Sequence, residues 1–205
     1  LEIDNLIVSF KQILTEKNFL AFLLIGIGAY AGLYAVITGV APVMTGLLEQ
    51  NSDVFGYQFA AIMTGHFVSA VIAGRLVHVL GIKKLLFLGT STCLIGGLIL
   101  LIASLLNTIN IYTILLPCTV FLIGFALTIP GMTAGALSNF QHMAGRATSL
   151  LGFIQHGIGA LVSITLGFIA DGSTSMPMAI FLAVTSLFAF ISFTIYIPKI
   201  ILKVD

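Results

Sequence analysis

Six long apolar stretches constrain this chain more than any other feature of its sequence. Each is long enough to cross the roughly 30 Å hydrocarbon core of a bilayer as a helix, which takes about 20 apolar residues. The strands of a membrane β-barrel would instead alternate apolar and polar residues over about ten positions. The sequence therefore predicts an all-α integral membrane bundle of six transmembrane helices, at residues 19–48, 54–80, 83–106, 110–137, 144–170 and 176–198.

The composition agrees with a membrane environment. Only 7% of the 205 residues are charged and 59% are hydrophobic, whereas a soluble domain carries about 25% charged residues. So little polar surface excludes soluble enzymes and disordered proteins. The net charge of +1 supplies no basic field for nucleic acid. We therefore expect the lipid bilayer, and no nucleic acid, as a partner of this chain.

The sequence lacks the residue patterns of enzymes and of metal sites. Phosphate loops, paired catalytic carboxylates and CxxC spacing are missing, and no polar site is available to activate a serine. Cys93 and Cys118 lie in apolar runs and are interpreted as buried apolar residues. His66 and His156 belong to different spans, with no third metal ligand nearby. We expect no enzymatic activity, no cofactor and no metal.

The basic residues predict the orientation of the chain. They fall in the amino-terminal segment, at the second and fourth connections and in the tail 199–205, and they are Lys11, Lys17, Arg75, Lys83, Lys84, Arg146, Lys199 and Lys203. The other three connections contain no Lys or Arg. Cytoplasmic loops carry the excess of Lys and Arg. Both termini are therefore expected in the cytoplasm.

Residues 1–18 precede the first span and have two interpretations. Ile3, Leu6, Ile7 and Phe10 recur at helical spacing beside Lys11. This pattern is typical of an amphipathic helix at the cytoplasmic interface, and it is equally compatible with a linker. The chain begins with Leu1 rather than Met, so we also expect it to be a piece of a longer protein.

Glycines recur along two spans at intervals of seven residues. Gly32, Gly39 and Gly46 form one series, and Gly145, Gly152 and Gly159 form the other. Helices in lipid associate by close van der Waals packing, for which small residues are favoured. We expect these glycines to mark helix contact faces; a flexing role in a moving transporter is the alternative.

Two stretches of the sequence resemble a known family. Residues 74–84 resemble the loop signature of the major facilitator superfamily, glycine-x-leucine-x-aspartate-basic-x-glycine-x-basic. Gly74, Leu76, Gly81 and Lys83 match this signature, and His78 replaces its aspartate. Residues 138–155 resemble the loop and eleventh helix of the bicyclomycin and chloramphenicol resistance type of drug:proton antiporter, with matches at Ala144, Gly145, Ala147, Leu150, Gly152 and Gln155.

The resemblance implies that the chain is the carboxyl-terminal half of such a transporter, helices seven to twelve. Each half of that fold is a three-plus-three inverted repeat, and substrate binds at the midplane between the halves. The implied function is proton-coupled export of small amphipathic molecules by alternating access. The implied location is the bacterial inner membrane as a multi-pass protein, with a missing amino-terminal six-helix half as partner. Residues 1–18 would then be the central cytoplasmic linker.

Several mid-span residues are candidates for binding substrate. Tyr30, Tyr34 and Thr38 share one face of the first span, and aromatic residues repeat this arrangement on the fourth. Multidrug pockets combine apolar and aromatic walls with a few polar groups, although either face is equally compatible with helix packing. The histidines are able to titrate near neutral pH or to bond across helices as neutral rings. The expected substrate-binding residues are Tyr30, Tyr34, Thr38, His66, Phe121, Phe125, Gln155 and His156.

A second group of candidates lies at the expected cytoplasmic edge, where it would anchor helix ends or make gating contacts between loops. This group comprises Gly74, Arg75, Gly81, Lys83, Gly145 and Arg146. Two other functions remain open at this point. One is a stand-alone six-helix protein that acts as a homodimeric pore or scaffold. The other is a carrier of the same superfamily for a different class of metabolite.

Overall fold

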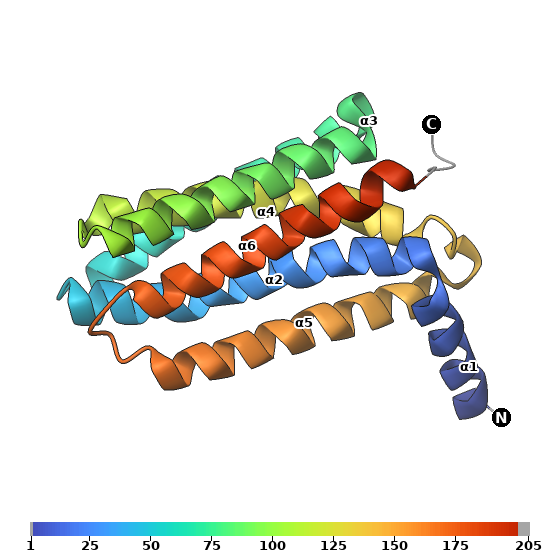
Figure 1. The fold of residues 1–205 in the computed structure, drawn as a ribbon, viewed down its shortest axis with the longest axis horizontal. Helices are drawn as coiled ribbons and strands as arrows, with labels where there is room; N and C mark the ends of the chain where they lie inside the picture. The colour runs from blue at the N-terminus through green and yellow to red at the C-terminus, as the bar shows by residue number, and fades with distance from the viewer. Residues whose placement is uncertain (1, 201–205) are drawn as a thin grey trace.

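The computed structural model describes the backbone of residues 2–200 and the side chains of residues 8–200. Within these bounds all the regular elements are helices, joined by short connections, which confirms the predicted all-α membrane fold (Figure 1). The expectations for Ile3, Leu6, Ile7 and Lys203 concern side chains outside the described residues. The principal helices are α1 (Glu2–Thr15), α2 (Lys17–Pro42), α3 (Ser52–Leu105), α4 (Ile111–Leu137), α5 (Ala144–Ile169) and α6 (Met176–Tyr196).

Proline and polar residues set the ends of these helices. Pro42 ends the regular part of α2, which continues as a short π-helix, η1 (Val43–Leu47). At the start of α4, the Asn110 side chain accepts hydrogen bonds from the backbone N–H groups of Tyr112 and Thr113, while the Thr113 hydroxyl accepts one from the Asn110 N–H. This reciprocal capping satisfies donors that a helix start leaves without partners.

α3 reverses its direction at Gly81. This glycine has φ 75° and ψ 163° inside an otherwise helical run of 54 residues, a conformation that glycine adopts without steric cost. The arm before it (residues 52–80) runs parallel to α4, because Gly65 faces Thr119 and His66 contacts Leu122. The arm after it (residues 82–105) runs antiparallel to α4, because Leu86 faces Gly131 and Gly96 faces Phe121. We call them the first and second arms.

Among residues 2–200, five helices are long and apolar enough to cross a membrane. The predicted count of six spans is not confirmed by this criterion, because residues 54–80 and 83–106 both fall within α3. The sequence suggested a loop of Gly81, Ile82, Lys83 and Lys84 between two separate helices. The backbone leaves the helical conformation at Gly81 alone, so the two helices are present and a single residue, rather than a loop of four, joins them.

The centre of the bundle is held together by close contacts at glycines. A Cβ atom at Gly28 would lie 2.7 Å from the Thr185 carbonyl oxygen of α6, and one at Gly39 would lie 2.6 Å from Cγ of Met178. These approaches agree with the predicted packing role of the α2 glycines. In the other series, Gly159 packs against the Tyr34 ring, but Gly145 has open space where its Cβ would be. The α5 series therefore does not form one continuous contact face within this chain.

α2 is the central helix, and α5 lies at the edge of the bundle. Within the most apolar 18-residue stretch of each helix, 61% of the residues are buried in α2 and 28% in the helix that contains α5. α5 packs mainly on α2, while the second arm of α3 packs on both α4 and α6. Figure 1 shows α5 as the outermost helix on one side of the bundle. α2 and α4 thus pack side by side, with α5 on the outer side of α2 and the first arm on the outer side of α4.

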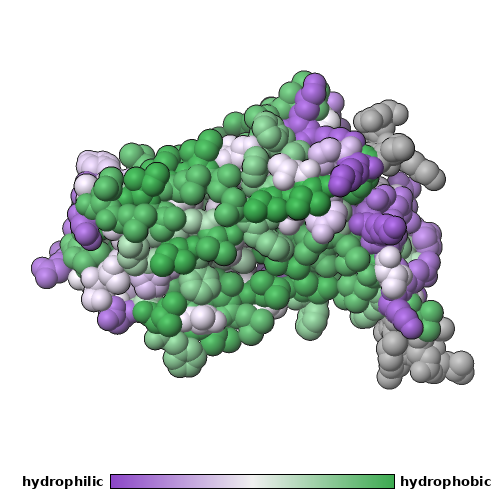
Figure 2. Space-filling view, in the orientation of Figure 1, coloured by the Kyte–Doolittle hydropathy of each residue, from purple (hydrophilic) through white to green (hydrophobic). Residues whose placement is uncertain are grey.

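Charged residues are separated between the two ends of the bundle. The basic residues of the described part gather at the end where α2 begins and α3 reverses: Lys11, Lys17, Arg75, Lys83, Lys84, Arg146 and Lys199. The carboxylates of Glu49, Asp53 and Asp171 lie at the other end. Figure 2 shows hydrophilic residues at the two ends and hydrophobic residues across the middle. This is the surface of a protein that crosses a bilayer.

α1 leans out from the basic end of the bundle, next to the start of α5 (Figure 1). Arg146 Nη1 donates a hydrogen bond to Ser9 Oγ over 2.7 Å. The Glu16 carboxylate accepts one bond from the Phe19 N–H and another from the Asn139 side chain, over 2.6 and 3.0 Å. The segment that precedes α2 is therefore a helix tied to the bundle.

Candidate functional site

Five side chains from four helices meet at the middle of the bundle. Tyr30 and Tyr34 come from α2, His66 from the first arm of α3, Phe125 from α4 and His156 from α5. Each lies close to the midpoint of its own helix or arm, so all five lie at the same depth. We call these five residues the aromatic–imidazole cluster.

Ring contacts connect the members of the cluster. The Tyr30 ring packs edge-on to Phe125, with centroids 5.2 Å apart, and edge-on to His156, with centroids 5.1 Å apart. On the far side of Phe125, the His66 ring lies 5.6 Å away at 32°. Edge-to-face pairs at these separations are favourable beyond the area that they bury. Tyr30 and Phe125 therefore separate the two imidazoles.

Hydrogen bonds fix how each imidazole is held. His66 Nδ1 lies 3.0 Å from the carbonyl oxygen of Leu122, which can only accept a hydrogen bond. Nδ1 of His66 must therefore carry the proton in the neutral ring, which leaves Nε2 as the acceptor. His156 Nδ1 lies 3.1 Å from the Tyr34 hydroxyl, and both of these groups can donate or accept.

The cluster borders a hollow of about 330 Å³. Its lining consists of Tyr30, His66, Ala70, Phe125, Ala126, Ile129 and Pro130. The wall is mainly apolar and aromatic, with one phenol and one imidazole as polar groups, which is the composition of small-molecule sites. Pro130 has no N–H to give to the Ala126 carbonyl, so this acceptor lacks its usual helical partner.

Of the eight predicted residues, Tyr30, His66 and Phe125 line the hollow and the other five do not. Two of those five are buried between helices. The Phe121 side chain is fully buried, because its ring fills the notch that Gly32 leaves in α2. Gln155 is also buried; its amide donates to the Met132 sulfur and packs on Gly26. Both side chains serve helix packing in this structure. Their spacing on α4 and α5 does not reveal this, because the notches that receive them belong to α2.

Thr38 lies one turn beyond the cluster. Its hydroxyl is 2.7 Å from that of Ser163, and the pair joins α2 to α5. Ser163 and Ala70 were not among the residues expected from the sequence. Pro130 was the available signal, because a proline inside a membrane helix leaves a backbone carbonyl without its partner.

The predicted edge residues all lie at the basic end of the bundle. Arg146 contacts α1 through Ser9, as an anchoring role requires. Gly81 forms the reversal of α3. Arg75 is exposed and Lys83 is half-buried, and Gly74 and Gly145 have nothing within 4 Å of where a Cβ would be. Among the side chains of residues 8–200, no three His, Cys, Asp or Glu lie together as a metal site needs.

The fold and the hollow at its middle define a multi-pass helical membrane protein. No family model matches the chain. Multidrug resistance protein D of Escherichia coli is 28% identical to it over 175 residues, which cover 85% of this chain and 44% of that protein. The uncharacterized MFS-type transporter YdgK of Bacillus subtilis is 24% identical over 89% of this chain and 44% of its own length.

A third relative is the bicyclomycin resistance protein homolog of Haemophilus influenzae, which is 23% identical over 75% of this chain and 38% of its own length. The relatives of this chain are thus drug-resistance transporters and an MFS-type transporter, which confirms the resemblance found in the sequence. All three are named as transport or resistance proteins and none as an enzyme. The chain spans less than half the length of these curated relatives.

Proposed function

We propose that this chain is the carboxyl-terminal half of a multidrug efflux transporter of the bacterial inner membrane. The carrying observation is the aromatic–imidazole cluster, of which Tyr30, His66 and Phe125 line a hollow at mid-depth in a chain whose relatives include drug-resistance transporters. Residues 138–155, which resemble the loop and eleventh helix of the bicyclomycin-resistance type, support assignment to the second half. The partner in the complete protein is then a preceding six-helix half.

The two arms of α3 would each cross the bilayer, which brings the number of crossings to six. A continuous helix of 54 residues would measure about 80 Å at 1.5 Å per residue, far longer than the roughly 30 Å hydrocarbon core. The reversal at Gly81 folds this length into two antiparallel arms of about 40 Å each. Six crossings would allow the three-plus-three inverted repeat of a superfamily half.

The basic end of the bundle would face the cytoplasm. It carries every Lys and Arg of residues 8–200, and the excess of these residues marks cytoplasmic loops. With six crossings, both termini would lie on that side. α1 would then lie at the cytoplasmic surface as the linker from the first half, tied to α5 by the Arg146–Ser9 bond.

The cluster would form one wall of the substrate site, and the missing half would form the other. The flanking first arm and α5 have many exposed apolar side chains, including Phe67 at 68% and Phe153 at 78% exposure. Aromatic walls with few polar groups suit varied amphipathic molecules, because apolar contacts are less directional than hydrogen bonds. Alternating access would move the two halves around this wall.

His66 and His156 are the candidates for proton coupling within this half. They are the titratable cationic groups at mid-depth, whereas the carboxylates of Glu16, Glu49 and Asp171 lie at helix ends. Protonation would make both ring nitrogens of His156 donors. His156 would then donate to the Tyr34 hydroxyl and could no longer accept from it. Proton binding would thereby fix the direction of a hydrogen bond beside the hollow, in whose lining His66 is the imidazole.

Drug export by the complete gene product in cells that lack their own exporters tests this function. Tyr30→Ala removes the ring between Phe125 and His156, and we expect at least tenfold more accumulation of a fluorescent amphipathic drug. Tyr57→Ala is the matched control, because this tyrosine is 81% exposed near the start of α3. Unchanged export of every compound by Tyr30→Ala, at equal membrane abundance, would contradict the site.

The mass of the native gene product tests the half-transporter assignment separately. An antibody against this segment should detect a band near twice 21.7 kDa. A band at 21.7 kDa would instead identify a six-helix protein, for which a homodimer would have to complete the site.

A further inference from the structure

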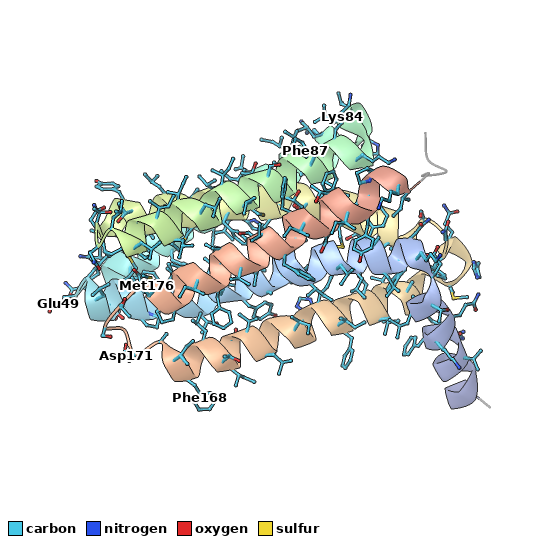
Figure 3. All side chains as sticks on the ribbon, viewed as in Figure 1. Glu49, Lys84, Phe87, Phe168, Asp171 and Met176 are labelled. Atoms are coloured by element: carbon cyan, nitrogen blue, oxygen red, sulfur yellow. The ribbon has the colours of Figure 1, made fainter. Side chains whose placement is uncertain are left out.

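A second hollow lies on the outside of the bundle, at the point where α3 reverses. It has a volume of about 350 Å³ and is lined by Leu80, Lys83, Lys84, Phe87 and Leu88. The lining surface is apolar, so Lys83 and Lys84 contribute the aliphatic stems of their side chains to it. Figure 3 shows Lys84 and Phe87 beside the reversal, at the basic end of the bundle. We call this hollow the elbow groove.

Aromatic packing holds one wall of the elbow groove in place. The Phe87 ring lies 5.8 Å from Phe193 and 6.4 Å from Phe190, both on α6. Phe87 still keeps 48% of its surface exposed, and Leu88 keeps 43%. The groove lies on the side of the second arm and α6, whereas the aromatic–imidazole cluster has no member from either. It is therefore a separate feature from the candidate substrate site.

An apolar stripe continues from the groove along the second arm. Leu88, Ile95, Ile99 and Ile102 follow helical spacing and are 43%, 52%, 45% and 54% exposed. From Leu88 to Ile102 the stripe extends about 21 Å at 1.5 Å per residue. One surface therefore combines two cations, Lys83 and Lys84, with a long apolar stripe.

The positive charge of the groove is not offset by nearby acids. Among the described side chains, Glu16 is the carboxylate at the basic end, and its oxygens accept bonds from Phe19 N–H and Asn139. The other described carboxylates, Glu49, Asp53 and Asp171, lie at the opposite end. A ligand with its own negative charge would thus complement Lys83 and Lys84.

We propose that the elbow groove binds an anionic phospholipid. Its phosphate group lies between the Lys83 and Lys84 ammonium groups, and its acyl chains follow the apolar stripe of the second arm. Each Lys near a membrane surface contributes about 1 kcal/mol to attraction of anionic lipid, or about a fivefold increase in affinity. Free phosphate would gain the charge contacts alone, because it has no acyl chains to pack on the apolar stripe.

Native mass spectrometry of the complete protein in a neutral detergent tests this site. The probes are phosphatidylglycerol and phosphatidylcholine with the same acyl chains, and inorganic phosphate at millimolar concentration is the competitor. We expect phosphatidylglycerol to bind more tightly than phosphatidylcholine and to stay bound in phosphate. The Lys83→Gln/Lys84→Gln variant should bind it roughly 30-fold more weakly. Lys17→Gln, which loses an exposed charge at the start of α2, should bind as the parent does.

Three results would overturn the proposal: equal binding of both lipids, undiminished binding by the double variant, or full displacement by phosphate. The third would assign the lysines to a free anion. If the double variant does not fold, Lys84→Gln replaces it, because this lysine is exposed. Its expected loss is about fivefold, and binding equal to the parent would refute the site. A Leu88→Ser variant should weaken lipid binding without changing the preference for the anionic headgroup.

Discussion

Replacement of Gly96 by alanine should destabilise the bundle more than the same replacement at Gly65, on the first arm of α3. A Cβ at Gly96 would lie 2.7 Å from the Phe121 backbone nitrogen and 2.8 Å from the Pro117 carbonyl oxygen. Both atoms belong to the α4 backbone and cannot move without the helix. Since nonbonded carbon contacts are optimal near 3.5–4.0 Å, the second arm and α4 would have to separate by about 1 Å.

The magnitude follows from two opposing effects. Overpacking of a tight interface costs typically about 1–3 kcal/mol, and contact with backbone on one side favours the upper value. Alanine recovers up to about 1 kcal/mol of helix propensity relative to glycine. The expected net loss is about 2 kcal/mol, which for a chain of this size lowers Tm by roughly 4–8 °C.

Thermal unfolding in detergent measures this loss through the two native thiols. Cys93 and Cys118 are free and buried, so a maleimide dye should label them only as the bundle opens. Gly65→Ala is the matched control, because it lies on the same helix and faces the same partner. Its Cβ would be 3.8 Å from Thr119 Cγ2, an ordinary contact. We expect Gly65→Ala to leave Tm unchanged or to raise it by a few degrees.

A Gly96→Ala protein as stable as the parent would refute the close packing of the second arm on α4. The reversal of α3 would then also be in doubt, since it rests on the same contacts. Equal destabilisation by both variants would show instead that the first arm packs as tightly as the second.

Three further predictions concern single groups. Glu16→Ala removes the cap of α2 and the bond to Asn139, and should lower Tm by a few degrees for a loss of about 1 kcal/mol; Glu16→Gln keeps an acceptor and should lose less. In the folded protein, labelling of Cys93 and Cys118 by maleimide should be at least tenfold slower than in denaturant, and fast labelling would contradict their burial. Hydrogen bonds from the Ser173 hydroxyl and N–H lower the pKa of Asp171, so this carboxylate favours folding above its ordinary pKa and loses that effect as the pH falls through the lowered value. Ser173→Ala should therefore raise the pKa of Asp171 in a carboxyl NMR titration, and an unchanged value would contradict the bond.

The fold class was predictable because bilayer thickness imposes a length on every apolar run. Helical structure and a membrane location follow from that length without knowledge of any contact. The shortness of the connection inside α3 was not predictable in the same way. Gly81 and the two lysines after it are typical of a loop, yet the backbone leaves the helical conformation at this one glycine, which has a positive φ.

The depth of the candidate residues was predictable, but their lateral contacts were not. Mid-span positions on neighbouring helices reach the same level in the bilayer, which is why Tyr30, His66 and His156 come together. Phe121 and Phe125 share a face of α4 by spacing, yet only Phe125 reaches the hollow. The difference arises from Gly32 on another helix, whose missing side chain admits the Phe121 ring. Such a pairing depends on tertiary contacts that one chain's periodicity does not contain.

The unequal packing around α4 divides the chain into positions that resist change and positions that are free to vary. At Gly89, Gly96 and Gly124, any larger side chain meets the backbone of a neighbouring helix within 3 Å. The first arm and α5 have no such restriction along most of their outer surface, and they carry both imidazoles. New ligand preferences could therefore evolve on these two flanks while the rest of the bundle stays intact. A library for directed evolution should randomise the flanks and leave the glycines of the second arm and α4 unchanged.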